Sequence, residues 1–568
     1  MERSDGLVAG PRAAAARWPG RCGWAIAAAL PLGFLALFFV WPVLALVATG
    51  LFDSGSPGAV APGSVFAEPR TWRVIGQTLT QALLGTALSV LLGLPAAFVL
   101  YRLEFRGQSM LRGLATVPFV LPTVVVGVSF TALLGPGAPL SWLGLDQTLT
   151  AIVLALAFFN VTVVLRTVGG FWAQLDPRPE EAARMLGAAP VRVFLTITLP
   201  ALAPAIASAA ALVFLFCATS FGVVLILGGR QFSNIETEIY RLTVQFLDLR
   251  SAATLSIVQF AIVAAVLLLS ARLRKGRDRA VALRYTRRGA IRPTRAHAPA
   301  IAVFAATVLG LHVLPILALV WRSLRGVDGS LSLEHYAHLL SPPEGSRLDG
   351  TVFDAVWLSL QTATAATAIA MVLGVLTALV ASRQPRSPHL RWATRTFDGF
   401  VMLPLGVSAV TLGFGLLLTM HAPLGIGFDL RTSVVLIPIA QALIALPLVV
   451  RTLLPVLRGI DPRLRQAAAT LGASPLRILA TIDLAMLGRS AGLALGFAFA
   501  TSLGEFGATA FLVRPGDQTL PVVIAQLIGQ QGAENYGMAL AAAVVLGALT
   551  AGVMLVAERW RGEVAGEW

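Results

Sequence analysis

DPRPEEAARMLGAAPVRVFLTITLP, residues 176–200, has a near-copy in DPRLRQAAATLGASPLRILATIDLA, residues 461–485. The two segments align without a gap, 285 residues apart, and 13 of their 25 positions are identical. Each copy is polar and carries arginines, whereas the chain around it is mostly apolar. A polar segment repeated between apolar stretches indicates the place where a membrane protein meets a soluble partner.

The composition is typical of an integral membrane protein. Of the 568 residues, 57% are hydrophobic and only 12% are charged, whereas soluble proteins carry about 25% charged residues. The net charge of +15 comes mainly from arginines in the predicted inner loops, so it indicates membrane topology and we expect no nucleic-acid partner. The two cysteines, Cys22 and Cys217, predict neither a disulfide framework nor a metal site.

Hydropathy predicts an all-α polytopic membrane protein with about twelve transmembrane helices, six in each half. A crossing needs about 20 apolar residues. The candidate spans lie near 24–49, 75–100, 114–134, 149–167, 200–227, 251–271, 299–321, 356–381, 397–419, 433–451, 489–512 and 537–557. The bias of arginine towards one side predicts that both termini lie in the cytoplasm.

The two halves are predicted to be parallel repeats. Six is an even number, so the second half enters the membrane with the same orientation as the first. We expect a first repeat over 1–271, a basic cytoplasmic linker over 272–298 and a second repeat over 299–568. The similarity extends beyond the polar segments, because 79–102 also matches 360–383.

Each polar segment is predicted to form a short cytoplasmic helix. An Asp-Pro pair at 176–177 and at 461–462 suits a helix start, because Asp caps and Pro fits the first turn. Gly187 and Gly472 are placed to end the helices in a left-handed conformation. An ordinary connecting loop is the alternative, but such a loop has no reason to keep 13 of 25 residues.

The two segments resemble the EAA motif of permease subunits from binding-protein-dependent ABC importers. The first copy matches at Glu181, Ala182, Ala183 and Gly187, followed by Ile-Thr-Leu-Pro at 197–200. The second copy has Gln466, Ala467, Ala468 and Gly472, and lacks both the acid and the final proline. The resemblance implies that each segment is a coupling helix that docks on an ATPase subunit. It therefore implies two ATPase copies and a periplasmic solute-binding protein as partners.

The chain carries no nucleotide-hydrolysing motif of its own. A P-loop requires a Gly-Lys-[Ser/Thr] ending, and the one lysine, Lys275, is followed by Gly276 and Arg277. We therefore expect no catalytic residue, metal or cofactor in this chain, with ATP and Mg²⁺ bound by the partner ATPase. An ion-coupled secondary transporter is the alternative from another class. Such transporters use ionisable residues within the membrane, and Glu505 is the main candidate here.

The fused layout resembles two groups of permeases, those for thiamine or thiamine pyrophosphate and those for iron(III). Residues 216–242 and 501–529 resemble the thiamine group more closely. The expected function is therefore transport of thiamine or thiamine pyrophosphate from a periplasmic binding protein to the cytoplasm by alternating access. Iron(III) transport is the alternative.

A candidate gate lies near the outer end of the fifth and eleventh spans. A carboxylate at membrane depth costs roughly 2.5–3.5 kcal/mol unless a partner or cavity receives it. Glu505 is therefore expected either to bind Ser220, Thr219 or Arg514, or to line the solute path and favour a cationic solute. The gate residues in the second case are Ser220, Phe221, Glu505 and Phe506.

Overall fold

The computed structural model is helical throughout the residues that it describes. These are 18–52, 64–115, 117–229, 231–275, 292–326, 328–341, 348, 350–383, 387–425 and 427–560. Helices and short loops account for them, with no β-strand. In these ranges nine helices are long and apolar enough to cross a membrane, and two bent helix pairs raise the number to eleven. The protein is an all-α, multi-span membrane protein, as the sequence predicts.

The long helices follow the predicted spans closely. In the first half they are α2 and α3 (Trp18–Leu35 and Trp41–Phe52), α4 (Pro69–Arg102), α8 (Leu149–Trp172), α11 (Leu199–Ala218) and α14 (Leu249–Lys275). In the second half they are α15 and α16 (Ala298–Ala306 and Leu314–Ser323), α18 (Val352–Ala381), α21 (Leu436–Gly459), α24 (Ala485–Leu503) and α27 (Ala533–Trp560).

Local irregularities of these helices repeat as well. A π-helical segment joins the two helices of the first span in each half, η1 (Ala36–Val40) and η6 (Thr307–Val313). Another precedes the fifth span of each half, η4 (Phe194–Thr198) and η10 (Leu479–Leu484). The repeat found in the sequence is therefore also a repeat of backbone geometry.

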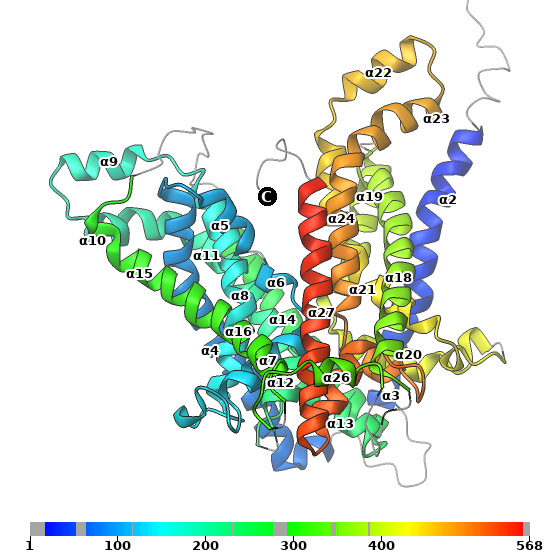
Figure 1. Ribbon diagram of the computed structural model, residues 1–568. Helices are drawn as coiled ribbons and strands as arrows, with labels where there is room; N and C mark the ends of the chain where they lie inside the picture. The colour runs from blue at the N-terminus through cyan, green and yellow to red at the C-terminus, as the bar shows by residue number, and fades with distance from the viewer. Residues whose placement is uncertain are drawn as a thin grey trace, which may run out of the picture.

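The helices form two arms (Figure 1). One arm is built on α4, α8 and α11, which pack on one another, and the other on their equivalents α18, α21 and α24. The first helix of each half lies on the opposite arm: α2 packs along α18, and α15 packs along α4. Thus the predicted ranges 1–271 and 299–568 describe the sequence repeat, whereas each arm contains a helix from the other repeat.

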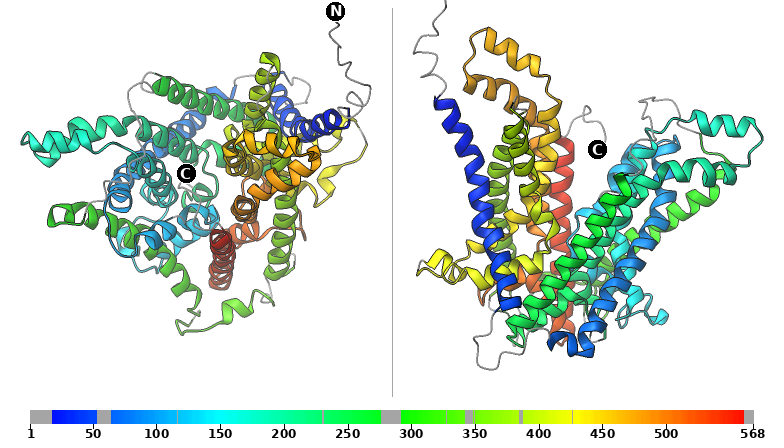
Figure 2. Two further views of the ribbon diagram at one scale, coloured as in Figure 1. Left: turned by 90° about the horizontal axis from the view of Figure 1, so that it is seen from above. Right: turned by 180° about the vertical axis from the view of Figure 1, so that it is seen from behind.

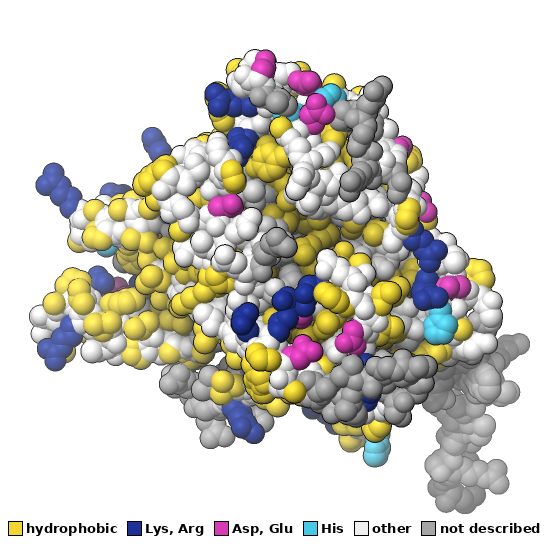
Figure 3. Space-filling model, turned by 90° about the horizontal axis from the view of Figure 1, so that it is seen from below, with side chains coloured by type: hydrophobic (Ala, Val, Ile, Leu, Met, Phe, Trp, Pro, Cys, Tyr) yellow, Lys and Arg dark blue, Asp and Glu magenta, His cyan; other side chains and the backbone are white. Residues whose placement is uncertain are grey.

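The arms diverge towards one end and converge at the other (Figures 1 and 2). The divergent end carries α9 (Arg178–Met185) and α10 (Pro190–Val193) on one arm and α22 (Pro462–Thr470) and α23 (Pro475–Ile478) on the other. We call it the coupling end. The convergent end contains α13 (Ile235–Val244) and α26 (Leu520–Gly529). Seen from the convergent end, charged side chains are spread over the surface (Figure 3).

The third span of each half is broken, which corrects the prediction of continuous helices there. In the first half α5 and α6 (Gln108–Leu114 and Val117–Val120) are followed by α7 (Thr123–Leu134), with a bend of 97° at Pro122. The predicted span 397–419 begins inside α19 (Pro388–Val401) and breaks before α20 (Ala409–Thr419). With 11 residues, α20 is only about 16 Å long, too short to cross alone.

Part of the predicted topology lies outside the described residues. The basic linker 272–298 falls largely on residues 276–291, and the chain ends fall on 1–17 and 561–568. The cytoplasmic placement of the linker and of both termini therefore stays a prediction.

Candidate functional site

The two polar repeats form hairpins of short helices at the coupling end. The Asp176 carboxylate accepts the backbone N–H of Arg178 at 3.0 Å, and the Asp461 carboxylate accepts that of Arg463 at 2.9 Å. Proline follows both aspartates at the helix start. The predicted Asp-Pro start is confirmed in the second copy, where Asp461 is the N-cap of α22 and Pro462 its first residue. In the first copy the start is shifted by one residue, because Pro177 is the N-cap of α9 and Asp176 precedes it.

The helices α9 and α22 end through the same glycine motif. Gly187 has φ of 82° and Gly472 has φ of 84°, in the left-handed region that favours glycine. One residue further, Ala188 N–H donates to Ala183 O and Ala473 N–H donates to Ala468 O, each at 3.0 Å. This six-to-one hydrogen bond across a left-handed residue is the Schellman motif. The predicted left-handed role of both glycines is confirmed.

The motif residues of both copies are available to a partner. Glu181 and Ala182 are exposed on α9, as are their equivalents Gln466 and Ala467 on α22, whereas Ala183 and Ala468 are half-buried. Beside them, Leu186 is 89% exposed and Leu471 is 88% exposed. Two large apolar side chains left in solvent at equivalent positions indicate contact surfaces.

A polar contact inside each hairpin was not predicted from the sequence. Glu180, next to the motif glutamate, forms an ion pair with Arg102 at the end of α4. In the second half the buried acid is Asp483, paired with Arg383 and Arg465. The alignment contained a signal for this contact. The first copy has Glu180 where the second has Arg465, and the second copy has Asp483 where the first has Thr198.

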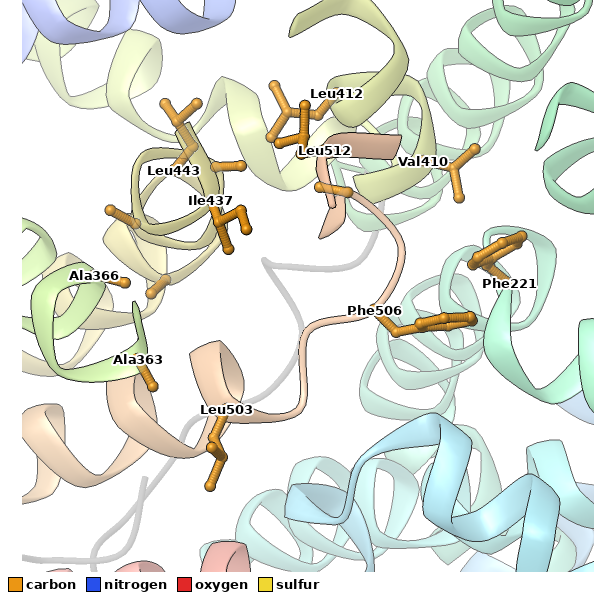
Figure 4. Close-up of a cluster of buried hydrophobic side chains, with 14 of the residues drawn as sticks. Phe221, Ala363, Ala366, Val410, Leu412, Ile437, Leu443, Leu503, Phe506 and Leu512 are labelled. Carbon is orange, nitrogen blue, oxygen red and sulfur yellow. The ribbon is translucent and has the colours of Figure 1, made fainter. Parts of the chain in front are cut away.

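The predicted gate residues lie at the convergent end, where the two halves meet. The rings of Phe221 and Phe506 stack with centroids 5.0 Å apart and planes 21° apart (Figure 4). Phe221 is 5% exposed and Phe506 is 4% exposed, and they come from different halves of the chain. Ser220, beside Phe221, is buried and its carbonyl accepts a hydrogen bond from the Asn234 side chain.

Glu505 is held by the backbone, which corrects its predicted partners. Its two carboxylate oxygens accept the N–H groups of Ala508 at 2.7 Å and Thr509 at 3.0 Å. They therefore cap α25 (Thr509–Leu512) in place of binding Ser220, Thr219 or Arg514. The negative charge sits at the helix N-terminus, where the helix dipole favours it. The path role of Glu505 stays a prediction.

A second contact joins the halves near these aromatic rings. The fully buried Glu236 of α13 accepts a hydrogen bond from Ser408 Oγ at 2.8 Å. Ser408 also caps α20, since its side chain accepts the N–H of Thr411. Burial raises the pKa of the Glu236 carboxyl to about 8, against the opposite effect of the Ser408 hydrogen bond. The convergent end is thus closed by both apolar and polar contacts between the halves.

The sequence was compared with known protein families. Residues 89–275 match the model for the inner membrane component of binding-protein-dependent transport systems. Residues 89–275 are therefore similar to this family. The matched range runs from α4 into α14 and includes the first polar repeat, residues 176–200. The protein is therefore a multi-pass inner-membrane permease and a transport subunit.

Curated relatives cover both halves of this permease. It is 28% identical to the thiamine transport system permease protein ThiP of Salmonella typhimurium over 529 residues, 91% of this chain and 92% of that protein. It is also 28% identical to ThiP of Escherichia coli over 484 residues, 83% and 86% of the two chains. The sulfate transport system permease protein CysT of Escherichia coli is 28% identical over 253 residues, 44% of this permease and 90% of CysT.

Among solved structures, a bacterial ABC transporter involved in the import of the acidic polysaccharide alginate matches with 19% identity and a TM-score of 0.39. The match covers 46% of this permease and 99% of that chain.

Proposed function

We propose that this permease is the membrane subunit of an ATP-driven importer that moves thiamine or thiamine pyrophosphate into the cytoplasm. The observation that carries the proposal is the pair of equivalent, glycine-ended hairpins exposed at one end of the molecule, one per arm. Two equivalent docking elements suit two copies of one ATPase subunit. The coupling end then faces the cytoplasm, in agreement with the predicted arginine bias.

The docking surface of each hairpin combines polar motif residues with an apolar tip. Leu186 and Leu471 supply large exposed side chains that a groove on the ATPase would bury. A buried leucine contributes about 1.5–3 kcal/mol, so these two side chains are suited to anchor the complex. ATP and Mg²⁺ bind to the ATPase subunits, and this chain contributes no cofactor. Gln466 replaces the motif glutamate, so the two dockings differ in charge.

The arrangement of the arms suits alternating access. The arms diverge towards the proposed cytoplasmic side, and the stacked Phe221–Phe506 pair closes the opposite end (Figures 1 and 4). In this conformation a solute between the arms would leave towards the cytoplasm. Separation of the two aromatic rings, with closure of the arms, would admit solute from a periplasmic binding protein. Ser220 and Glu505 adjoin this proposed gate.

The choice of thiamine rests on the relatives. The ThiP proteins share the fused two-half layout and resemble this chain over most of its length. CysT, whose name refers to sulfate, matches less than half of this chain. The thiazolium ring of thiamine carries a positive charge that suits a path with buried carboxylates near its outer end.

Co-purification and growth test this proposal. Native mass spectrometry of the detergent-solubilised complex is expected to show one permease bound to two identical ATPase subunits. A strain in which the gene is deleted, and which also lacks thiamine synthesis, is expected to need high external thiamine. A single bound ATPase, or none, contradicts the partnership. Normal growth of the deletion strain at low thiamine, with a new requirement for iron, would shift the substrate to iron(III).

A further inference from the structure

Each coupling hairpin is tied to the second span of its own half by a buried polar cluster. In the first half, Arg102 ends α4 and its guanidinium donates to Glu180 Oε2 at 3.0 Å. Thr198, the last residue of η4, donates from its hydroxyl to Glu180 Oε1 at 2.8 Å. The Arg102 and Glu180 side chains are 7% and 13% exposed, so solvent screens this pair little.

The second half has the same cluster with the acid on another element. Arg383, just beyond α18, donates to Asp483 Oδ2 at 2.7 Å, and Arg465 Nε donates to Asp483 Oδ1 at 2.8 Å. Asp483 belongs to η10 and is 0% exposed. Arg465 belongs to α22 and also donates to Leu457 O at 3.3 Å. Three elements therefore meet at one carboxylate, as they do in the first half.

The two clusters are related by an exchange of polar partners. Glu180 and Arg465 occupy the same position of the aligned repeat, and so do Thr198 and Asp483. The carboxylate is on the coupling helix in the first half and on the π-helical segment in the second. The arginine at the end of the second span is present in both halves. Replacement at only one of the two positions would bury either two acids or two bases together.

We propose that these clusters are the joints through which each coupling helix moves the second span of its half. This inference rests on the proposed function, because it requires the hairpins to be the sites of ATPase docking. The positioning residues are Arg102, Glu180 and Thr198 on one arm and Arg383, Arg465 and Asp483 on the other. The coupling helix, the segment leading into the fifth span and the end of the second span then shift as one body when the ATPase pulls on the hairpin.

The repeat itself supplies the test, since each half can be converted into the arrangement of the other. Glu180→Arg leaves two bases without an acid, and Thr198→Asp leaves two acids with one base. The double variant Glu180→Arg/Thr198→Asp restores one acid between two bases, which is the arrangement of the second half. In the second half, Arg465→Glu and Asp483→Thr are the single changes, and their combination restores the arrangement of the first.

The readout is the amount of solute moved per ATP hydrolysed by the reconstituted complex of permease, ATPase and binding protein. Each single variant is expected to lower this ratio about ten-fold, and each double variant to return it to within about two-fold of wild type. If the charge reversals reduce folding, Glu180→Gln serves instead, because it keeps the size of the side chain and removes only its charge. The control is Asp429→Arg, a charge reversal next to Arg431 in an ion pair whose side chains are 34% and 36% exposed. Asp429→Arg is expected to leave the ratio of solute moved to ATP hydrolysed unchanged, because exposed ion pairs contribute little to stability.

The outcomes separate this inference from the proposed function. If wild-type complex shows no ATP-dependent transport, the proposed function fails. If wild type transports but single variants keep the wild-type ratio, the joint is refuted. The joint is also refuted if double variants assemble normally yet stay uncoupled. If Glu180→Gln lowers only the amount of folded complex and leaves the ratio unchanged, the cluster is structural and the joint is again refuted.

Discussion

Truncation of the stacked aromatic pair is expected to loosen the convergent end. In Phe506→Ala, Phe221 loses a ring whose centroid is 5.0 Å away and whose plane is nearly parallel. The two rings come from different halves, so they are in contact only while the halves are together at this end. In the proposed transport cycle the stack belongs to the closed gate and is lost on opening, so its removal should shift the gate towards the open state.

The size of this shift follows from the stacking energy. An aromatic pair contributes about 0.5–1.5 kcal/mol beyond the area that it buries. Only this contribution is assigned to the gate, since the burial of Phe506 also stabilises its own half. A change of about 1 kcal/mol alters an equilibrium about five-fold. The fraction of molecules with an open outer gate should therefore rise about five-fold in Phe506→Ala.

The assay is the rate at which an impermeant maleimide, added from the outer side, labels Ser220→Cys. Ser220 is 8% exposed and lies beside the stack, whereas the native Cys217 is 0% exposed and should react slowly. Cys22→Ser removes the other thiol. Labelling is compared with and without Phe506→Ala in the same background.

The matched control is Phe130→Ala. Phe130 contacts Phe158 edge to face, with centroids 6.2 Å apart, but both residues lie within the first half. This variant is expected to lower the melting temperature without a change in labelling. Equal labelling rates in wild type and Phe506→Ala, or an equal increase in the Phe130→Ala control, would refute the gate.

Three further predictions concern the coupling end, the helix cap and the topology. Gly187→Ala and Gly472→Ala should each destabilise a hairpin by about 1 kcal/mol. No atom crowds the new Cβ, but the left-handed backbone conformation disfavours a residue that has one. Weaker binding of the ATPase in a pull-down would support this prediction, and wild-type binding would contradict it. Glu505→Gln keeps one carbonyl acceptor for the α25 cap, so the complex should assemble, and lower uptake of a cationic solute would support the path role while unchanged uptake would reject it. Cysteines placed at Met185 and Thr470 should be labelled only from the cytoplasmic side, and labelling of either from outside would overturn the predicted orientation.

The sequence predicted those features that depend on local chemistry. Capping by Asp461 and the left-handed Gly187 and Gly472 each depend on a few neighbouring residues, so the pattern was sufficient. Most spans were also predictable, since about 20 apolar residues in a row have few alternatives to crossing a membrane. The exposed positions of Glu181 and Gln466 followed from their polarity.

The features that were missed depend on contacts between distant segments. Hydropathy does not show which arm a first helix joins, so the positions of α2 and α15 were not predicted. The window over 397–419 averaged across a break and therefore merged α19 with α20. One expectation for Glu505 was a side-chain partner, but the backbone N–H groups of Ala508 and Thr509 at the start of α25 bind its carboxylate instead. The clusters at Glu180 and Asp483 required both copies to be compared position by position.

The most direct test of the central claim is thiamine uptake by proteoliposomes that contain the permease and its ATPase. They are supplied with binding protein outside and ATP inside, and an ionophore removes all ion gradients. The account predicts accumulation of labelled thiamine that requires ATP, both partners and an intact permease. Uptake that persists without ATP and disappears with the ion gradient would contradict it and identify an ion-coupled transporter.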